Sequence, residues 1–411
     1  MLSAKSAEVV EATLPAVGGA IGDITPLFYQ KMFAAHPELL RDLFNRGNQA
    51  NGTQRQALAG SIAAFASALI AHPDQRPDAM LARIAHKHVS VGISNDQYRI
   101  VHEHLFAAIV EVLGEAVTPE VAAAWDEVYW LMANALIAVE DRLRAEAAAA
   151  QGGDPADLWR PYTVVARYQE TDDVTTYLVR PADGGPVPPS RPGQYVSVRA
   201  ELPDGARQIR QYSLSGDPDG ALQFTVKRAP ATADGAPAGE VSNHLHDHLH
   251  AGDTVELAPP LGDLTLAGGG SGTGADAGPV LLASAGIGNT PMTAMLAHLA
   301  ATGSTRTVIS VHGDRDQLSH AFRADLGQLT AKLPNASAHV FYERPLGDWP
   351  QERTGLVDLS TVDIPAGTTA YLCGPLPFLR SVRGQLLTAG VPAAAIHYEV
   401  FGPDLWLGQD A

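Results

Sequence analysis

Apolar positions in the first 143 residues recur with the period of an α-helix. One segment carries Leu27, Phe28 and Met32 and is expected to end before Pro37, because the residue before a proline disfavours helical backbone. Later segments repeat apolar residues every three or four positions, over residues 58–69, 98–112 and 125–143. The pattern predicts an all-α N-terminal domain over residues 1–143.

The period changes after a stretch at 144–157 that we interpret as a linker, because it brings alanine together with glycine, aspartate and proline. From Tyr162 onward, apolar and polar residues alternate with a period of two. Strands are expected at residues 162–165, 175–179, 195–198 and 222–226. Short strands separated by Pro- and Gly-containing turns predict a small antiparallel β-barrel over residues 158–266.

A Gly-rich run at 267–279 is predicted to be a surface loop. After it, strands alternate with helices. The strands are expected at residues 279–283, 307–311, 337–342 and 369–372, and the helices at 292–301 and 321–332. This alternation predicts an α/β domain with a parallel sheet over residues 280–411.

Composition and charge limit which molecules the protein is expected to bind. The net charge of −17 disfavours nucleic acid and anionic membrane surfaces. The lone cysteine, Cys373, excludes an internal disulfide and a cysteine-ligated zinc or iron–sulfur site. The N-terminus lacks the basic start and apolar core of a signal peptide, and no apolar run approaches the roughly 20 residues of a membrane span. We therefore expect a cytoplasmic protein without integral membrane association.

The segment 81–88 contains the first candidate for metal chemistry. Helical spacing places Leu81, Ile84 and His88 on one apolar face, whereas His86 lies about 200° away from His88. A histidine on an apolar face is more often a satisfied core residue than a metal ligand. Spacing alone leaves both interpretations of His88 open.

Two motifs in the later domains suit nucleotide binding. On the barrel, Arg210 precedes Tyr212 and Ser213, so a guanidinium could bind a pyrophosphate while the hydroxyls reach a ring system. In the α/β domain, the strand at 280–283 runs into a turn with Gly286 and Gly288 and then into a helix, whose N-terminus favours anions.

A cluster at 244–250 nearly matches the zinc or di-iron signature H-x-H-x-D-H. It lacks the residue between His246 and Asp247 that the signature requires, which changes which side chains converge. We expect an exposed helix near the barrel there, and not a metal site.

The motifs and their order resemble the ferredoxin–NADP reductase family. The resemblance implies that FAD is held by Tyr195, Arg210, Gln211, Tyr212 and Ser213. It implies that the pyridine nucleotide is held by Gly286, Ile287, Gly288, Asn289, Thr290 and Pro291 together with Cys373, Gly374 and Pro375. The closing segment Glu399, Val400, Phe401, Gly402 and Pro403 would adjoin the flavin, with Phe401 over its ring and Glu399 influencing its potential.

Two questions stay open within this resemblance. Cys373 either lies by the nicotinamide or is an inert buried thiol. For the choice between NADH and NADPH, Arg315 favours a 2′-phosphate, whereas Asp314 and Asp316 repel one. The balance favours NADH.

The full chain, over about residues 1–405, resembles the flavohaemoglobins. The resemblance is carried by residues 28–33, 37–40, 44–45, 51–58 and 84–88, followed by Gln97, Tyr98 and Glu140. It implies that His88 is the proximal ligand of a haem b iron and that Tyr98 and Glu140 hydrogen-bond its second nitrogen. It further implies a distal pocket of Tyr29, Gln54 and Leu58, with Phe44 against the porphyrin and Lys87 among the cofactor-binding residues.

This family resemblance implies a nitric oxide dioxygenase. NAD(P)H would reduce FAD, FAD would reduce haem, and NO and O₂ would be converted to nitrate by a monomer that binds no nucleic acid. The family also allows a lipid in the haem pocket. Two alternatives remain: a dioxygen carrier or sensor whose reductase keeps haem ferrous, and a general flavin reductase.

Overall fold

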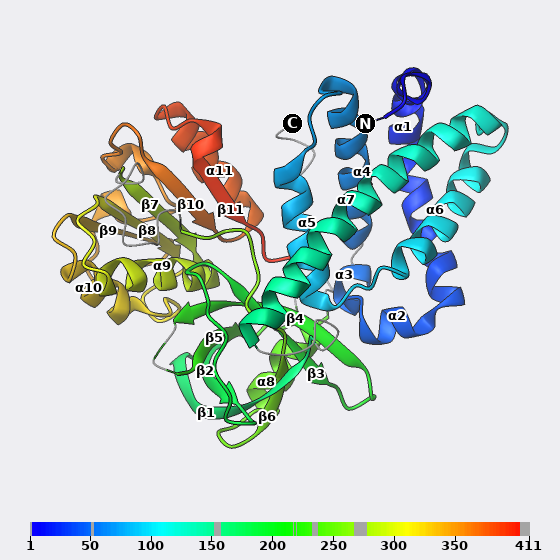
Figure 1. The fold of residues 1–411 in the computed structure, drawn as a ribbon. Helices are drawn as coiled ribbons and strands as arrows, with labels where there is room; N and C mark the ends of the chain where they lie inside the picture. Colours follow the sequence, from blue (N-terminus) through cyan, green and yellow to red (C-terminus); the bar gives the residue numbers. More distant parts are fainter. Residues whose placement is uncertain are drawn as a thin grey trace.

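The computed structural model describes residues 2–50, 53–151, 158–216, 218, 220–231, 237–266 and 278–402, without the side chains of residues 50, 53–57, 59 and 79. The chain folds into three parts in the order in which the sequence pattern changes (Figure 1). The predicted Gly-rich loop, apart from its last two residues, lies outside the described residues.

The N-terminal part is helical, as predicted. Its elements are α1 (Ala4–Ala35), α2 (Pro37–Asp42), α3 (Arg46–Ala50), α4 (Thr53–Ala71), α5 (Asp78–Val91), α6 (Gln97–Leu113), the 3₁₀ turn η1 (Gly114–Ala116) and α7 (Pro119–Gln151). α7 continues past Arg144, where the apolar pattern ends, because alanine is the best helix former and residues 145–150 are mostly alanine. The first half of the predicted linker is therefore helix.

The middle part is a closed antiparallel barrel with strand order β1-β2-β5-β4-β3-β6. Its elements are β1 (Arg160–Thr171), β2 (Val174–Pro181), β3 (Tyr195–Glu201), β4 (Arg207–Gly216), β5 (Leu222–Lys227), the helix α8 (Glu240–His248) and β6 (Thr254–Leu257). The predicted alternation holds, since apolar side chains of each strand, such as Tyr177, Val198 and Phe224, fill the barrel interior.

The C-terminal part is a five-stranded parallel sheet of order β11-β10-β7-β8-β9. Its elements are β7 (Val280–Ala285), η2 (Gly286–Gly288), α9 (Asn289–Ala301), β8 (Val308–Asp314), α10 (Arg323–Ala331), β9 (Ala336–Tyr342), η3 (Gln351–Arg353), η4 (Leu359–Thr361), β10 (Thr369–Cys373), α11 (Leu376–Thr388), η5 (Ala393–Ala395) and β11 (Ile396–Glu399). The strand order reverses between β7 and β10. In open α/β sheets, ligands bind outside the carboxyl ends of the strands at such a reversal.

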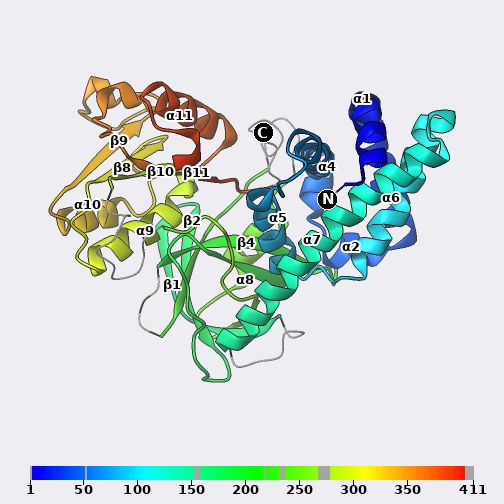
Figure 2. The ribbon, with the colours of Figure 1, turned by 45° about the horizontal axis from the view of Figure 1, so that its top comes forward.

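The helical part and the α/β part stand side by side on the barrel. Figures 1 and 2 show α5 and α7 descending onto the barrel beside β4, while the chain that leaves β11 runs toward α5. This arrangement brings the end of the last strand to the junction of all three parts. None of the helices in the described ranges is long and apolar enough to cross a membrane.

Candidate functional site

A cavity of about 590 Å³ lies where the three parts meet. Residues as far apart in sequence as Phe28 and Gly402 line it. Its helical end is apolar, with walls that include Met32, Leu105 and Leu136. Pockets for small molecules and cofactors typically span about 300–1,000 Å³ and combine apolar walls with a few polar groups. The volume and the lining of the cavity therefore fit a small molecule or a cofactor.

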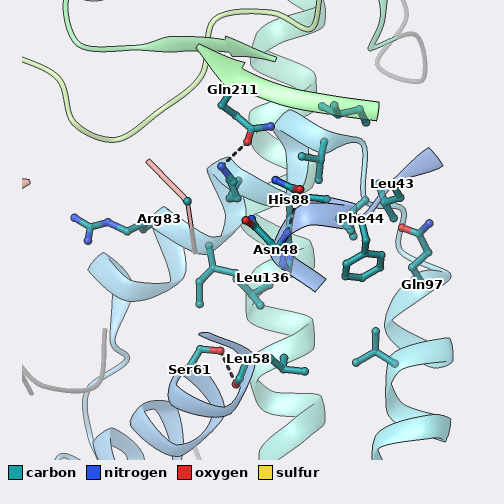
Figure 3. Close-up of a pocket in the computed structure, with 18 of the residues that line it drawn as sticks. Leu43, Phe44, Asn48, Leu58, Ser61, Arg83, His88, Gln97, Leu136 and Gln211 are labelled. Carbon is teal, nitrogen blue, oxygen red and sulfur yellow. Dashed lines mark hydrogen bonds between the residues drawn. The ribbon is translucent and has the colours of Figure 1, made fainter. Parts of the chain in front are cut away.

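His88 reaches this cavity from α5 (Figure 3). Its Nδ1 lies 2.9 Å from the hydroxyl of Tyr98 and 2.9 Å from Oε1 of Glu140. The Tyr98 hydroxyl also donates to Glu140 Oε1, at 2.5 Å. Because Nδ1 is used by these partners, Nε2 is the nitrogen left for a ligand in the cavity.

Glu140 and Tyr98 form a buried acceptor–donor pair. Glu140 is fully buried, although the helical pattern places it only on the flank of the apolar stripe of α7. Burial, followed by the charge of Glu140, raises the pKa of Tyr98 far above its usual range, so the phenol stays protonated and acts as a donor. The structure thus brings together all three residues predicted for this side of the cavity.

His86 serves a different contact. It is buried, and its Nδ1 accepts the backbone N–H of Gly262 in the barrel at 3.2 Å. Burial lowers its pKa, which favours the neutral ring that can accept this bond. His88 lines the cavity, whereas His86 is not among the described residues that line it.

Tyr29, Phe44 and Leu58 also line the helical end of the cavity. Tyr29 is buried in α1, and the rings of Tyr29 and Phe44 meet edge to face with centroids 5.9 Å apart. Figure 3 shows Phe44 and Leu58 among the side chains that line the cavity together with His88. The side chain of Gln54, predicted beside them, lies outside the described residues.

At the barrel end, the predicted flavin-binding residues line the same cavity: Tyr195, Arg210, Gln211, Tyr212 and Ser213. They come from adjacent strands, since Tyr195 on β3 pairs with Ser213 on β4. Burial lowers the pKa of Arg210. A partly buried guanidinium beside a cavity fits an anionic ligand such as a pyrophosphate.

Lys87 connects the two ends. Its Nζ donates to Oε1 of Gln211 on β4 at 2.5 Å, and Figure 3 shows Gln211 reaching from the barrel toward α5. Nζ also lies 5.8 Å from the centre of the Tyr195 ring. Burial lowers the pKa of Lys87 to about 8, against the opposing effect of Glu399. This lysine therefore bridges the helix that carries His88 and the barrel.

A further part of the cavity wall has no counterpart among the predicted site residues, and it is formed by Lys227, Ala229, Gly239, Val241 and Ser242. Three of these residues lie at the start of α8, and a helix N-terminus attracts anions. Gly239, which precedes the helix, is the sequence feature that could have indicated this helix N-terminus.

The histidines later in α8 do not form the metal signature that they resemble. His246 is buried, with Nε2 2.9 Å from the carbonyl oxygen of Val226 and Nδ1 3.3 Å from Oγ1 of Thr175. No group of three or more potential metal ligands occurs in the part of the chain that the structure describes. The prediction of an exposed helix is wrong for the face of α8 that carries Val241, Leu245 and His246, because the barrel covers these side chains.

The two nucleotide motifs of the α/β part lie against each other. A Cβ on Gly288 would lie 2.2 Å from the carbonyl oxygen of Cys373 and 2.7 Å from the nitrogen of Gly374. The turn Gly286, Ile287 and Gly288 leads into Asn289, Thr290 and Pro291 at the start of α9, while Pro375 follows Gly374. The carboxyl ends of β7 and β10 therefore form one continuous surface at the strand-order reversal.

Cys373 is fully buried at this edge, and burial raises the pKa of its thiol. This environment favours the inert thiol of the two interpretations. Cys373 pairs in register with Glu399 on β11. The large cavity is lined by Glu399, Val400, Phe401 and Gly402. This closing segment therefore connects the nucleotide motifs to the cavity. Pro403 lies outside the described residues.

The three charged residues at the end of β8 all have partners in the structure, and Ser319 bonds to both aspartates. Asp314 is buried and accepts a hydrogen bond from Ser319 Oγ at 2.8 Å. Asp316 accepts two backbone N–H bonds, and Arg315 lies 3.6 Å from Asp173 of the barrel. The carboxylate of Asp314 is therefore held inside the domain.

Comparison with known proteins matches both ends of the chain to family models. The globin model matches residues 27–136, and the oxidoreductase NAD-binding domain model matches residues 282–384. The fold and the cavity thus define a globin joined to an NAD-binding oxidoreductase.

The curated relatives span the whole chain. A flavohemoprotein of Bordetella pertussis is 42% identical, over 98% of this chain and 99% of its own length. One of Chromobacterium violaceum is 41% identical, over 98% of both chains. The chain belongs to the flavohemoprotein family.

Solved structures agree with this assignment. The flavohemoglobin of Malassezia yamatoensis with bound FAD and haem matches with a TM-score of 0.86 and 37% identity, over 98% of this chain and all of its own. The FAD/NAD-binding domain of nitric oxide dioxygenase from Vibrio cholerae matches with a TM-score of 0.53 and 35% identity, over 59% of this chain and 99% of its own.

Proposed function

We propose that this protein is a nitric oxide dioxygenase that uses haem b, FAD and NAD(P)H, with NADH favoured. The observation that carries the proposal is the cavity that joins His88, backed by Tyr98 and Glu140, to the flavin-type residues of β3 and β4. The relatives support it, since one related structure contains FAD and haem and another belongs to a nitric oxide dioxygenase.

The helical end fits a haem. When bound, the haem supplies an iron for dioxygen, the flavin divides a hydride into single electrons, and NAD(P)H supplies that hydride. His88 would hold the iron through Nε2, while Glu140 and Tyr98 would orient the ring and give it anionic character. The Tyr29 hydroxyl, together with Gln54, would donate hydrogen bonds to a small ligand bound in the cavity.

The other residues bind and orient. Leu58 and Phe44 form an apolar wall that excludes water. Arg210 would neutralise the flavin pyrophosphate and Phe401 would cover the ring, while the turn before α9 would hold the phosphates of the pyridine nucleotide. The overall reaction consumes two NO, two O₂ and one NAD(P)H, and gives two nitrate, NAD(P)⁺ and one proton.

The test compares the wild-type protein with His88→Ala and with a matched control, His72→Ala, which alters an exposed histidine after α4. The wild type and His72→Ala are expected to show a Soret band and rapid NADH-dependent consumption of NO in air. His88→Ala is expected to lose the Soret band and to consume NO at least 100-fold more slowly. Reduction of an artificial acceptor by NADH should persist in all three proteins, because it needs only the flavin.

Two results would replace the proposal. Wild-type turnover of NO no faster than that of His88→Ala would indicate a general flavin reductase. Very slow autoxidation combined with negligible NADH-dependent NO consumption would indicate a dioxygen carrier or sensor.

A further inference from the structure

Arg144 lies one helical turn after Glu140 on α7 and interacts with its second carboxylate oxygen. Arg144 Nη2 is 3.4 Å from Glu140 Oε2, whereas His88 and Tyr98 both contact Oε1. The Arg144 side chain is only 18% exposed, and the carboxylate is fully buried. Oε1 of Glu140 therefore contacts His88 and Tyr98, whereas Oε2 contacts Arg144.

Arg144 also holds the end of the helix that carries His88. Its Nη2 donates to the carbonyl oxygen of Ile93, directly after the left-handed Gly92 that ends α5. The backbone N–H of Ile93 donates in turn to the carbonyl oxygen of His88 at 3.0 Å. The contacts thus form a closed ring that runs from His88 through Glu140, Arg144 and Ile93 back to His88.

We propose that Arg144 is a positioning residue that limits how strongly Glu140 acts on His88. The inference rests on the proposed function, in which His88 binds the haem iron. A guanidinium beside Oε2 draws negative charge away from Oε1, so the imidazole gains less anionic character from the carboxylate. Less electron density then reaches the metal, which raises its reduction potential.

The position of Arg144 sets it apart from its neighbours. Arg142, on the same helix, is 68% exposed and lies 3.7 Å from Glu146. Asp141 accepts from Arg144 Nη1 at 3.0 Å and is itself 56% exposed. Arg142 therefore provides a control of the same residue type without contact to Glu140.

The test uses the full-length holoprotein with Arg144→Gln, Arg144→Met, Arg144→Lys and Arg142→Met. Gln removes the charge and keeps donors for the Ile93 carbonyl, so it separates the charge from the anchoring of α5. Resonance Raman of the reduced protein is expected to show a higher iron–histidine stretching frequency in the Gln and Met variants. Spectroelectrochemistry should show a lower haem midpoint potential in both. Lys should restore most of each shift, and Arg142→Met should change neither.

A second measurement does not depend on haem. In the cofactor-free full-length chain with ¹⁵N-labelled histidine, the His88 Nδ1 proton should resonate further downfield in Arg144→Gln than in the wild type, because its bond to Glu140 strengthens. A folded Arg144→Gln protein with wild-type Raman frequency, potential and proton shift would overturn the inference. A wild-type protein that binds no haem would refute the proposed function, while the proton shift would still decide the role of Arg144.

Discussion

Substituting Gly288 by alanine tests whether the contact between the two nucleotide motifs controls use of NADH. The backbone of Gly288 has φ −62°, a value that alanine adopts without strain, so the effect is steric. The added Cβ would lie 2.2 Å from the Cys373 carbonyl oxygen, where an ordinary contact is 3.4–4 Å. All the nearest atoms belong to backbone, so the turn and the end of β10 must separate by about 1 Å.

The expected magnitude follows from this separation. Overpacking of a well-packed site costs about 1–3 kcal/mol of unfolding free energy. A displacement of about 1 Å can reduce a reaction rate by about 100-fold, and we expect a loss of this size in kcat/KM for NADH. The haem spectrum should be unchanged, because Gly288 does not line the large cavity.

The assay combines urea unfolding with stopped-flow reduction of the flavin by NADH. The control is Gly327→Ala, at an exposed site in α10 with no atom within 4 Å of the added Cβ. Alanine within a helix is expected to stabilise the control by about 0.5–1 kcal/mol and to leave NADH kinetics unchanged. Wild-type stability and kcat/KM in Gly288→Ala would refute the reasoning.

Three further predictions concern the junction and the cavity. Burial lowers the pKa of Lys87 from 10.5 to about 8, so between these pH values the unfolded chain binds more protons than the folded one. The unfolding free energy of the wild type, relative to that of Lys87→Met, should therefore increase as pH rises from 8 to 10.5. A difference in unfolding free energy that stays constant with pH in urea unfolding would contradict this. Arg83→Ala removes a guanidinium 4.4 Å from the Tyr398 ring centre and 3.5 Å from Asp263. It should speed hydrogen exchange in β11, and unchanged exchange there would exclude a role in docking that strand. Phe28→Ala, at a fully buried position, should lower the unfolding free energy by about 3–5 kcal/mol in calorimetry or denaturant, and a loss under 1 kcal/mol would show that the site collapses around the deletion.

Local patterns in the sequence predicted the three-part fold well. Apolar residues recur about every 3.6 positions in the helical part and every two positions in the barrel, and both periods alternate in the α/β part. Each period shows which face of a helix or strand is buried, and this burial stabilises the element. The strand β11 was not predicted, because its four residues, Ile396–Glu399, are too few to show a period. The extension of α7 was missed because alanine propensity, without an apolar stripe, stabilises its last turns.

The polar contacts of the site were harder to predict. Resemblance to a family paired Glu140 with His88, whereas the helical pattern alone placed Glu140 at the edge of the apolar stripe. The bond from Gly262 to His86 joins residues 176 positions apart and leaves no local signal.

The range of residues around the cavity also governs when it can form during synthesis. Its walls include residues of the first helix and Gly402, near the end of the chain. At about 5–20 residues per second, translation needs roughly 13–50 seconds to proceed from Leu136, the last lining residue of the N-terminal helical part, to Gly402. During that interval the nascent helical domain exposes the apolar wall that the barrel and the closing segment later cover. Early occupancy of this wall by a bound group would therefore protect the growing chain from aggregation before the barrel and the α/β part have been synthesised.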